Sequence, residues 1–564
     1  MTENKETTET HDFIKALLPL LNLKARVQNT SSWLDLAYIG LNSRPDDKKA
    51  GLKWWTELTE QGGRDPVECL LHYNQLLENA LPVTVKTLGF YARQDSPKEY
   101  TNWHKQWYQA ALKTAAESLS HAAIAQAVYR CGWLDFVVTS MKHNQIRHFN
   151  GIHLMLLEDD TKLLELVSKV LLPAVRQMTT IAAESGDETL TKQLVQLTKK
   201  LGNRAFVAAV LKEVREEFYV DAAHLDANPN LMGLANGVLE CTEGKVRVRP
   251  GKPEDYISKS SEVAYDAKLS EESPQVKQLL DWLHQVFPGD DMFHYACKLF
   301  AATLCNTDSG KGPYLWVGGP DSGMSALENL YKATLGPYAV TAPAGGKYNL
   351  SAFEQAQLRS AKVVLVPEEK VRGASFDEEL ISKTTLVLQC AVFPDLTDAD
   401  EAALKRLKFL LFKTRWLREG YPEDVKEQVR FRVYKSDPAF VAAVDGLAAA
   451  FLWLLMRYYP LAVAEGLARP KALQEQIAEQ RKAVSPYDLF IKEHLLLGQD
   501  ASVGVPELYD AFKQWYRLTY DGQLVPTVGT FRDEVSKPKR LGKLELSRRW
   551  HGVALKPDEL PLPA

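Results

Sequence analysis

Residues 316–327, WVGGPDSGMSAL, have the composition and spacing of a loop that cradles phosphate groups. Such a loop follows a buried strand and opens a helix; its glycine amides face the anion, a lysine contacts the β- and γ-phosphates, and a serine or threonine contacts Mg²⁺. The residues that match the cradle are Gly318, Gly319, Asp321, Ser322, Gly323 and Ser325. Met324 stands at the position of the lysine, and its thioether carries no charge. The pattern therefore leaves open a weak, non-hydrolysing site for ATP and Mg²⁺ that has lost its main counter-charge.

Three apolar runs would place this loop in a parallel α/β core. Residues 314–317, 361–370 and 384–393 are apolar over the length of a buried strand, and segments with helical spacing separate them. Strands that alternate with helices indicate a parallel sheet. Lys311 precedes the first of these strands, so it should lie at the far end of the sheet and does not replace the missing lysine.

Other segments are helical or contain a hairpin. Apolar residues recur at i, i+3 and i+4 over residues 12–120, and the pattern continues to about residue 222. Residues 228–257 contain Asn-Gly and Glu-Gly turns beside short apolar runs, which predicts a tight β-hairpin. The tryptophans of the first segment could stack on bases from exposed positions, but we expect them in the core of a small helical domain.

Composition and charge exclude several classes of protein. The 564-residue chain is 45% hydrophobic and 25% charged, as in ordinary globular proteins. Its net charge of −4 creates no global attraction to nucleic acid, so any DNA contact must be a local patch. The N-terminus is polar and acidic, unlike a signal peptide, and the longest apolar run, residues 446–456, is too short to span a bilayer. We therefore expect a soluble intracellular protein with no membrane partner.

Several further segments are characteristic mainly through the order in which they follow one another along the chain. They are TSSWLDLAYIGLN with LKWWTEL, SHAAIAQAVYRCGWLDFV with HFN, LDANPNLMGLANGVLE (225–240), KPEDYIS (252–258), and the tail segments SPYDLFIKEHLL, VPELYDAFKQWY, TFRDEV and RRWHGVAL. Together with the loop, they resemble the helicase half of the poxvirus-type primase–helicase family of large DNA viruses, phages and plasmids. The motor of that family is a superfamily-3 helicase of the AAA+ class.

The resemblance implies a multidomain α/β fold with a helical N-terminal region, a small domain that contains a β-hairpin, an AAA+-like parallel core, a helical bundle and a C-terminal winged helix. The implied divisions are a primase-C-terminal-like helical module at 12–120, a helicase N-terminal domain at 121–272, the superfamily-3 domain at 273–437, a helical segment and linker at 438–482, and a winged-helix-like domain at 483–564.

The resemblance also implies roles for single residues. Glu368 aligns with the acidic residue that positions magnesium and the attacking water, with Glu369 as the second choice and a solvated strand end as the alternative. Magnesium would then be held by Ser325 and Glu368. Ala391 stands where the family has an asparagine that senses the γ-phosphate, and Arg406 matches the arginine finger that acts on a neighbouring subunit. The family's Leu-Thr-Gly-Gly-Asp motif, which leads to a DNA-gripping hairpin, is missing.

Residues 537–550, KPKRLGKLELSRRW, form the best local basic patch. The candidate DNA-binding residues are Lys537, Lys539, Arg540, Lys543, Arg548 and Arg549. They would contact phosphates without reading bases, and a solvated charged face is an equal alternative.

The joint loss of the lysine, the sensor and the gripping motif favours a catalytically degenerate DNA-replication subunit. We expect it to bind DNA and to form a homo-oligomeric ring, such as a hexamer, or to pair with an intact paralogue. One alternative is an active ATP-dependent helicase in which Met324 is engineered or tolerated. The other alternative is a repurposed structural or virion protein.

Overall fold

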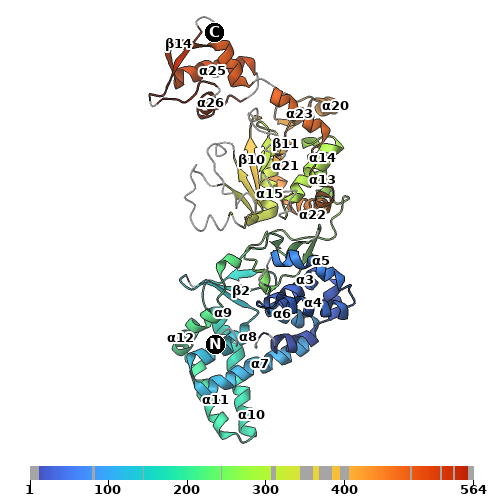
Figure 1. The fold of residues 1–564 in the computed structure, drawn as a ribbon, viewed down its shortest axis with the longest axis vertical. Coiled ribbons are helices and arrows are strands. Elements are labelled where there is room, and N and C mark those ends of the chain that lie inside the picture. Colours follow the sequence, from blue (N-terminus) through green and yellow to red (C-terminus); the bar gives the residue numbers. More distant parts are fainter. Residues whose placement is uncertain are drawn as a thin grey trace. The chain divides into compact units, whose positions relative to one another are not determined.

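The computed structural model divides the chain into two compact units, Met1–Ala267 with Thr334–Tyr338, and Lys268–Ala333 with Ala339–Ala564 (Figure 1). The residues that the structure describes are 10, 12–78, 83–143, 145–242, 244–305, 313–342, 358, 360–367, 384–393, 406–482, 485–520, 524–537, 540–545 and 547–556.

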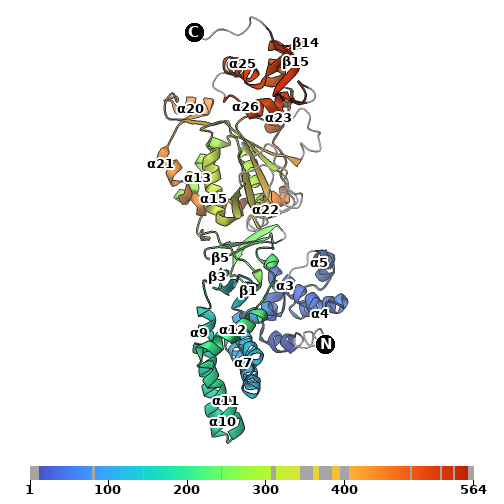
Figure 2. The ribbon, with the colours of Figure 1, turned by 90° about the vertical axis from the view of Figure 1, so that its left-hand side faces the viewer.

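The first unit combines helices with two antiparallel three-stranded sheets. The sheets contain β1 (Phe136–Ser140), β2 (Gln145–Phe149) and β3 (Leu154–Leu156), and β4 (Leu231–Leu234), β5 (Gly237–Thr242) and β6 (Lys245–Arg249). The helices are α2 (Leu23–Gln28), α3 (Thr30–Asn42), α4 (Lys48–Gln61), α5 (Val67–Glu78), α6 (Val85–Asp95), α7 (Pro97–Ser118), α8 (His121–Gly132), α9 (Thr161–Leu166), α10 (Leu172–Glu184), α11 (Glu188–Leu201) and α12 (Arg204–Glu217). Figure 2 shows α10 and α11 lying side by side.

Two sequence predictions are confirmed in this unit. The β4–β5 hairpin turns at Ala235-Asn236, since Leu234 pairs with Gly237, the first residue of β5. Trp33 and Trp55 are fully buried, and their ring centroids lie 4.6 Å apart in the core of the first helices. These two tryptophans are therefore core residues and not a surface for stacking bases.

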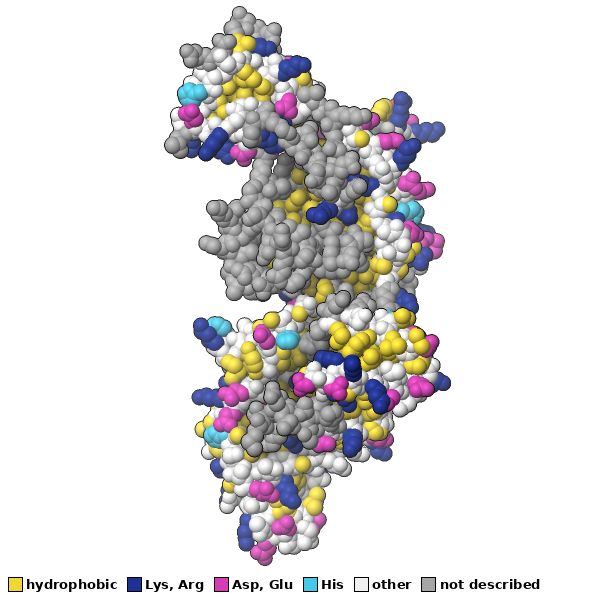
Figure 3. Space-filling model, in the orientation of Figure 1, with side chains coloured by type: hydrophobic (Ala, Val, Ile, Leu, Met, Phe, Trp, Pro, Cys, Tyr) yellow, Lys and Arg dark blue, Asp and Glu magenta, His cyan; other side chains and the backbone are white. Residues whose placement is uncertain are grey.

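Helix α5 is amphipathic, but its strongest apolar stripe faces outward. Val67, Leu70 and Leu71 are 57%, 64% and 74% exposed, whereas Cys69 and Leu76 are buried. Apolar side chains gather on the surface over this helix (Figure 3).

The second unit is built on a parallel sheet in the strand order β11-β7-β10-β9-β8. These strands are β7 (Pro313–Val317), β8 (Ala339–Thr341), β9 (Val363–Val366), β10 (Thr385–Cys390) and β11 (Lys408–Leu411). The helices that follow or pack near them include α13 (Pro274–Val286), α14 (Asp290–Ala302) and α15 (Met324–Leu335). The predicted parallel α/β core is confirmed; β9 and β10 are shorter than the apolar runs that predicted them, and β7 begins one residue before its run.

A short β–α–β excursion follows β11. It consists of β12 (Arg415–Leu417), α20 (Val425–Phe431) and β13 (Val433–Lys435), and its two strands pair in parallel. Next comes the helical stretch Pro438–Glu465, which by length and composition alone could cross a membrane. Its main helix, α22 (Ala448–Glu465), packs on α14 and fully buries Phe451 and Leu455, so we assign it to the core of this unit.

The tail begins after α23 (Lys471–Lys482). It contains α24 (Pro486–His494), α25 (Val505–Thr519) and α26 (Val528–Val535) beside the antiparallel pair β14 (Leu495–Gly504) and β15 (Arg549–Leu555). Its helices and strands share a core that includes Phe490, Phe512, Phe531 and Trp550. The assignment of the tail as a winged helix remains a prediction.

Candidate functional site

The predicted phosphate loop lies at the carboxyl edge of the parallel sheet. β7 ends at Val317, which pairs with Cys390 of β10 on one side and with Leu411 of β11 on the other. The Gly318 amide donates a hydrogen bond to the Cys390 carbonyl oxygen at 3.0 Å. Because both neighbours of β7 come much later in the chain, the loop lies where the strand order switches, and open α/β sheets bind ligands at that place.

Packing fixes the shape of this loop. Gly323 has a φ of +85° and Asp321 a φ of +57°, both in the left-handed region. A Cβ on Gly323 would lie 2.9 Å from the Trp416 ring, and a Cβ on Gly318 would lie 2.6 Å from Cβ of Phe412. The Trp416 amide also donates to the Asp321 carbonyl oxygen at 2.8 Å. The two glycines are therefore required by their surroundings, and the loop is held in place from the β11 side.

The loop leads directly into α15, whose first helical hydrogen bond runs from the Leu327 amide to the Gly323 carbonyl oxygen. The amides of the first helical turn have no intrahelical acceptor, and the helix dipole makes this end attractive to anions. Ser325 is exposed at this end and Met324 is half-buried beside it. Ser322 is only 4% exposed, and its hydroxyl has no hydrogen-bond partner among the described residues.

The other residues predicted for the motor lie in different places. Ala391 directly follows Cys390, so it stands at the carboxyl edge beside the loop, and its methyl group cannot hydrogen-bond a phosphate. Arg406 is exposed and precedes β11 at the opposite edge of the sheet. At roughly 3.3 Å per residue, Arg406 is about 17 Å from the loop edge of its own sheet. Glu368 and Glu369 lie outside the described residues.

A polar contact that the sequence did not indicate joins β10 to α15. The Gln389 side-chain amide donates to Glu328 at 2.9 Å, and Glu328 also pairs with Lys332 at 2.6 Å. This contact fixes the helix that carries the loop against the strand that carries Ala391. The ammonium group of Lys332 is engaged in the ion pair with Glu328.

The basic residues of the tail divide into two groups. Arg540 is turned inward: its side chain is 5% exposed and pairs with Asp488 and Glu534, both at 2.6 Å. Lys537 pairs with Glu534 at 2.8 Å. Lys539 lies outside the described residues. Lys543 and Arg548 are exposed, and so is Arg549, whose guanidinium donates to Ser502. The last three residues form what we call the tail cation group.

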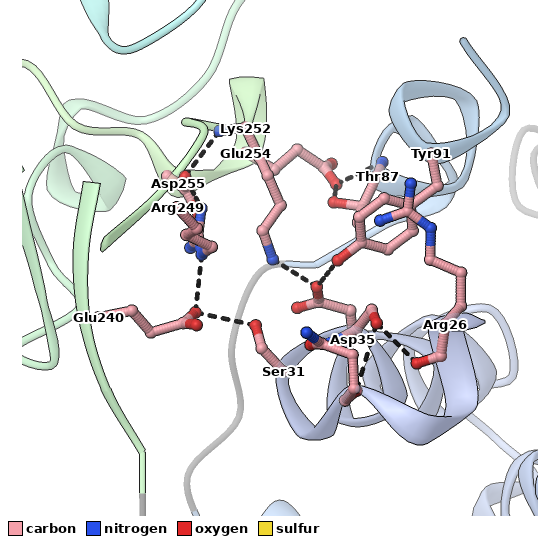
Figure 4. Close-up of polar contacts among 12 residues, drawn as sticks. Arg26, Ser31, Asp35, Thr87, Tyr91, Glu240, Arg249, Lys252, Glu254 and Asp255 are labelled. Carbon is pink, nitrogen blue, oxygen red and sulfur yellow. Dashed lines mark hydrogen bonds and ion pairs between the residues drawn. The ribbon is translucent and has the colours of Figure 1, made fainter. Parts of the chain in front are cut away.

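The KPEDYIS segment lies in a buried polar network of the first unit (Figure 4). Lys252 pairs with Asp35 of α3, and Asp35 also accepts a hydrogen bond from Tyr91 of α6. The Glu254 carboxylate accepts hydrogen bonds from the Thr84 and Thr87 amides at 3.0 and 2.9 Å, at the start of α6. Each of these charged groups is satisfied within the protein, so the segment joins the hairpin to the N-terminal helices and does not form a reactive site.

A second half of the network surrounds Glu240 on β5. Arg249 donates to Glu240 at 2.9 Å and pairs with Asp255 at 2.8 Å, while Arg247 pairs with Glu240 at 2.6 Å. Burial acts to raise the pKa of Glu240, but the positive charges of Arg249, Lys252 and Arg247 outweigh it and lower the pKa to about 2. Burial raises the pKa of Glu254, against the hydrogen bonds from Thr84 and Thr87.

The chain matches known proteins along most of its length. Residues 135–288 match the family model "D5 N terminal like". A protein of Acanthamoeba polyphaga mimivirus, "Putative helicase L207/L206", is 23% identical over 78% of this chain and 50% of its own length. "Putative helicase 121R" of Invertebrate iridescent virus 3 is 22% identical over 93% of this chain and 65% of its own length. "Putative primase C962R" of African swine fever virus (strain Badajoz 1971 Vero-adapted) is 20% identical, over 85% and 56%.

The chain thus spans about half to two thirds of the length of these relatives. The family model and the named relatives agree with the resemblance carried by the ordered sequence motifs. These matches support the similarity of the chain to viral helicases and primases of the primase–helicase family.

Proposed function

We propose that this protein is a helicase-type DNA-replication subunit that binds a nucleotide and does not hydrolyse it. The observation that carries the proposal is that Met324 and Ala391 both stand at the carboxyl edge of the sheet, in place of a lysine and an asparagine. A glycine-containing loop joins β7 to α15 there, without the side chains that would bridge and sense the terminal phosphates.

The site fits the phosphates of ATP through its backbone. The amides of Gly319 and of residues 321–325, at the start of α15, would hold the phosphates. The Ser325 hydroxyl would reach Mg²⁺ with Glu368. Bound Mg²⁺ would neutralise phosphate charge. Turnover needs more, because removing one preorganised donor to the transition state typically lowers kcat by about 10²–10³. Loss of both the lysine and the asparagine should therefore abolish measurable hydrolysis.

The experiment is an incubation of the full chain with ATP and Mg²⁺, followed by measurement of bound nucleotide and released phosphate. We expect retained, intact ATP and no phosphate above background. Turnover by the wild-type chain would favour the active helicase, in which Met324 is tolerated.

We further propose that the tail contacts DNA through the tail cation group, Lys543, Arg548 and Arg549. Each neutralised phosphate releases counterions, with a log–log salt slope of about −0.9 per contact on duplex DNA. Three contacts would give a slope of about −3. Affinity that ignores salt, or that survives charge reversal at Arg548 and Arg549, would favour the structural or virion alternative.

We also propose that the chain assembles into an oligomer. Because Arg406 is remote from its own loop, a ring in which it faces the loop of a neighbour is the arrangement that would use it. The partner would be another copy or an intact paralogue, and the setting would be the interior of a host cell. Monomeric behaviour at micromolar concentration in light scattering, alone and with nucleotide, would contradict the homo-oligomer.

A further inference from the structure

The chain segment after β11 runs along the phosphate loop and touches it at two points. At one end, Phe412 abuts Gly318: its amide donates to the Val317 carbonyl oxygen at 2.8 Å. At the other end, Trp416 contacts Asp321 through its amide and covers Gly323 with its ring. Residues 413–415, which lie between these two contacts, therefore run beside the loop on its β11 side.

Two of the three intervening residues are cations that face away from the core. Thr414 is fully buried, and its hydroxyl donates to the Gln285 carbonyl oxygen at 2.6 Å. Lys413 and Arg415, on either side of it, are exposed. A third cation comes from the end of α20, because the Arg415 amide donates to the Arg432 carbonyl oxygen at 2.9 Å.

These cations have no counter-ion in the described part of the chain. No carboxylate there lies within ion-pair distance of Lys413, Arg415 or Arg432, although Glu479 exerts a weaker, more distant attraction on Lys413. Partial burial, and then repulsion by the charge of Arg432, lower the pKa of Lys413. Two cations that repel each other beside a loop of anion-binding amides favour an external anion.

We propose that the polyphosphate group of a bound nucleotide is this anion, and that Lys413 and Arg432 replace the charge missing at Met324. The inference rests on the proposed nucleotide binding and extends it by naming the residues that supply the charge. Nearby alternatives are committed elsewhere: Lys332 pairs with Glu328, and Arg406 stands at the opposite edge of the sheet. Charge placed on the β11 side supports binding, whereas the missing sensor at Ala391 still prevents turnover.

The test uses the full chain and isothermal titration calorimetry with ATP and with inorganic tripolyphosphate at low salt. The variants are Lys413→Gln and Arg432→Gln. Arg418→Gln is the matched control, since Arg418 is an exposed cation just after β12. We expect each of the two variants to weaken both ligands about tenfold, because a multiply charged ligand loses one nearby counter-charge. The control should change the affinity for both ligands less than twofold. Adenosine has no phosphate, so none of the three substitutions should change its affinity.

A double-mutant comparison adds a readout that depends on the loop itself. Met324→Lys returns a cation to the helix start, so it should tighten tripolyphosphate binding. In the Met324→Lys background, Lys413→Gln should lower the affinity for tripolyphosphate about twofold instead of about tenfold, because the two cations share one phosphate group.

The outcomes separate the inference from the proposed function. If the wild-type chain binds neither ATP nor tripolyphosphate at millimolar concentration, both the inference and the nucleotide site are overturned. If it binds both ligands but Lys413→Gln and Arg432→Gln match Arg418→Gln, only the inference is overturned. Thermal unfolding checks that the substitutions leave the fold intact.

Discussion

Replacing Lys252 with methionine tests whether the buried network stabilises the first unit. Lys252 is 7% exposed, and its ammonium group is the charged partner of Asp35, a buried carboxylate that otherwise accepts from the Tyr91 hydroxyl. Removing one partner of a buried ion pair typically costs about 3–5 kcal/mol, because the remaining charge stays desolvated. We expect Lys252→Met to lower the unfolding free energy of this region by an amount in this range.

The assay is hydrogen–deuterium exchange of the full chain, read on peptides from α3 and α6. A loss of about 3 kcal/mol corresponds to exchange that is roughly a hundredfold faster for amides that open with this region. Lys53→Met is the matched control, since Lys53 pairs with Glu57 on the surface at 3.9 Å with 80% of its side chain exposed. Such a pair contributes about 0–1 kcal/mol.

A double substitution sharpens the test. Asp35→Leu combined with Lys252→Met removes both charges, so it should recover most of the lost protection. The reasoning is refuted if Lys252→Met is as mild as Lys53→Met, or if the double variant is no better protected than the single one.

Three further predictions concern other parts of the chain. Arg540→Gln should destabilise the tail by about 1–3 kcal/mol and speed its proteolysis, since it removes the charged hydrogen bonds that the buried guanidinium makes to Asp488 and Glu534, whereas Arg548→Gln should leave proteolysis unchanged and weaken only DNA binding. Glu240 has a pKa lowered to about 2 from 4.5, so its contribution to stability is complete above about pH 4.5 and is lost as the pH falls toward 2; thermal unfolding of wild type and Glu240→Gln should therefore differ at pH 7 and converge in acid. Gly323→Ala should abolish nucleotide binding in calorimetry, because its φ of +85° and the nearby Trp416 ring both oppose a side chain.

Local patterns in the sequence predicted the elements that depend on local rules. Apolar runs marked β7, β9 and β10, and the Asn236-Gly237 dipeptide marked the hairpin to within one residue of its turn, because strand burial and turn geometry depend on neighbouring residues. Glycine spacing likewise marked the candidate loop between β7 and α15. The same signals could not decide which face of α5 is covered, since that depends on helices elsewhere in the chain.

Contacts between distant residues could not be predicted. Arg540 belongs to a basic stretch and was a candidate for DNA contact, but it pairs with Asp488, 52 positions away in sequence, and we leave it out of the proposed surface. The approach of residues 412–416 to the loop depends on the pairing of β11 with β7, which no spacing encodes. The sequence therefore pointed to the candidate loop but not to the cations that follow β11.

The central claim is that the motor has lost more than one catalytic group. Phosphate release from ATP and Mg²⁺, with and without DNA, tests it most directly in three proteins: wild type, Met324→Lys, and Met324→Lys combined with Ala391→Asn. We expect background rates from wild type and from Met324→Lys, and no more than partial recovery in the double variant. Robust hydrolysis by Met324→Lys alone would contradict the claim and would mean that a single substitution silences an otherwise intact helicase.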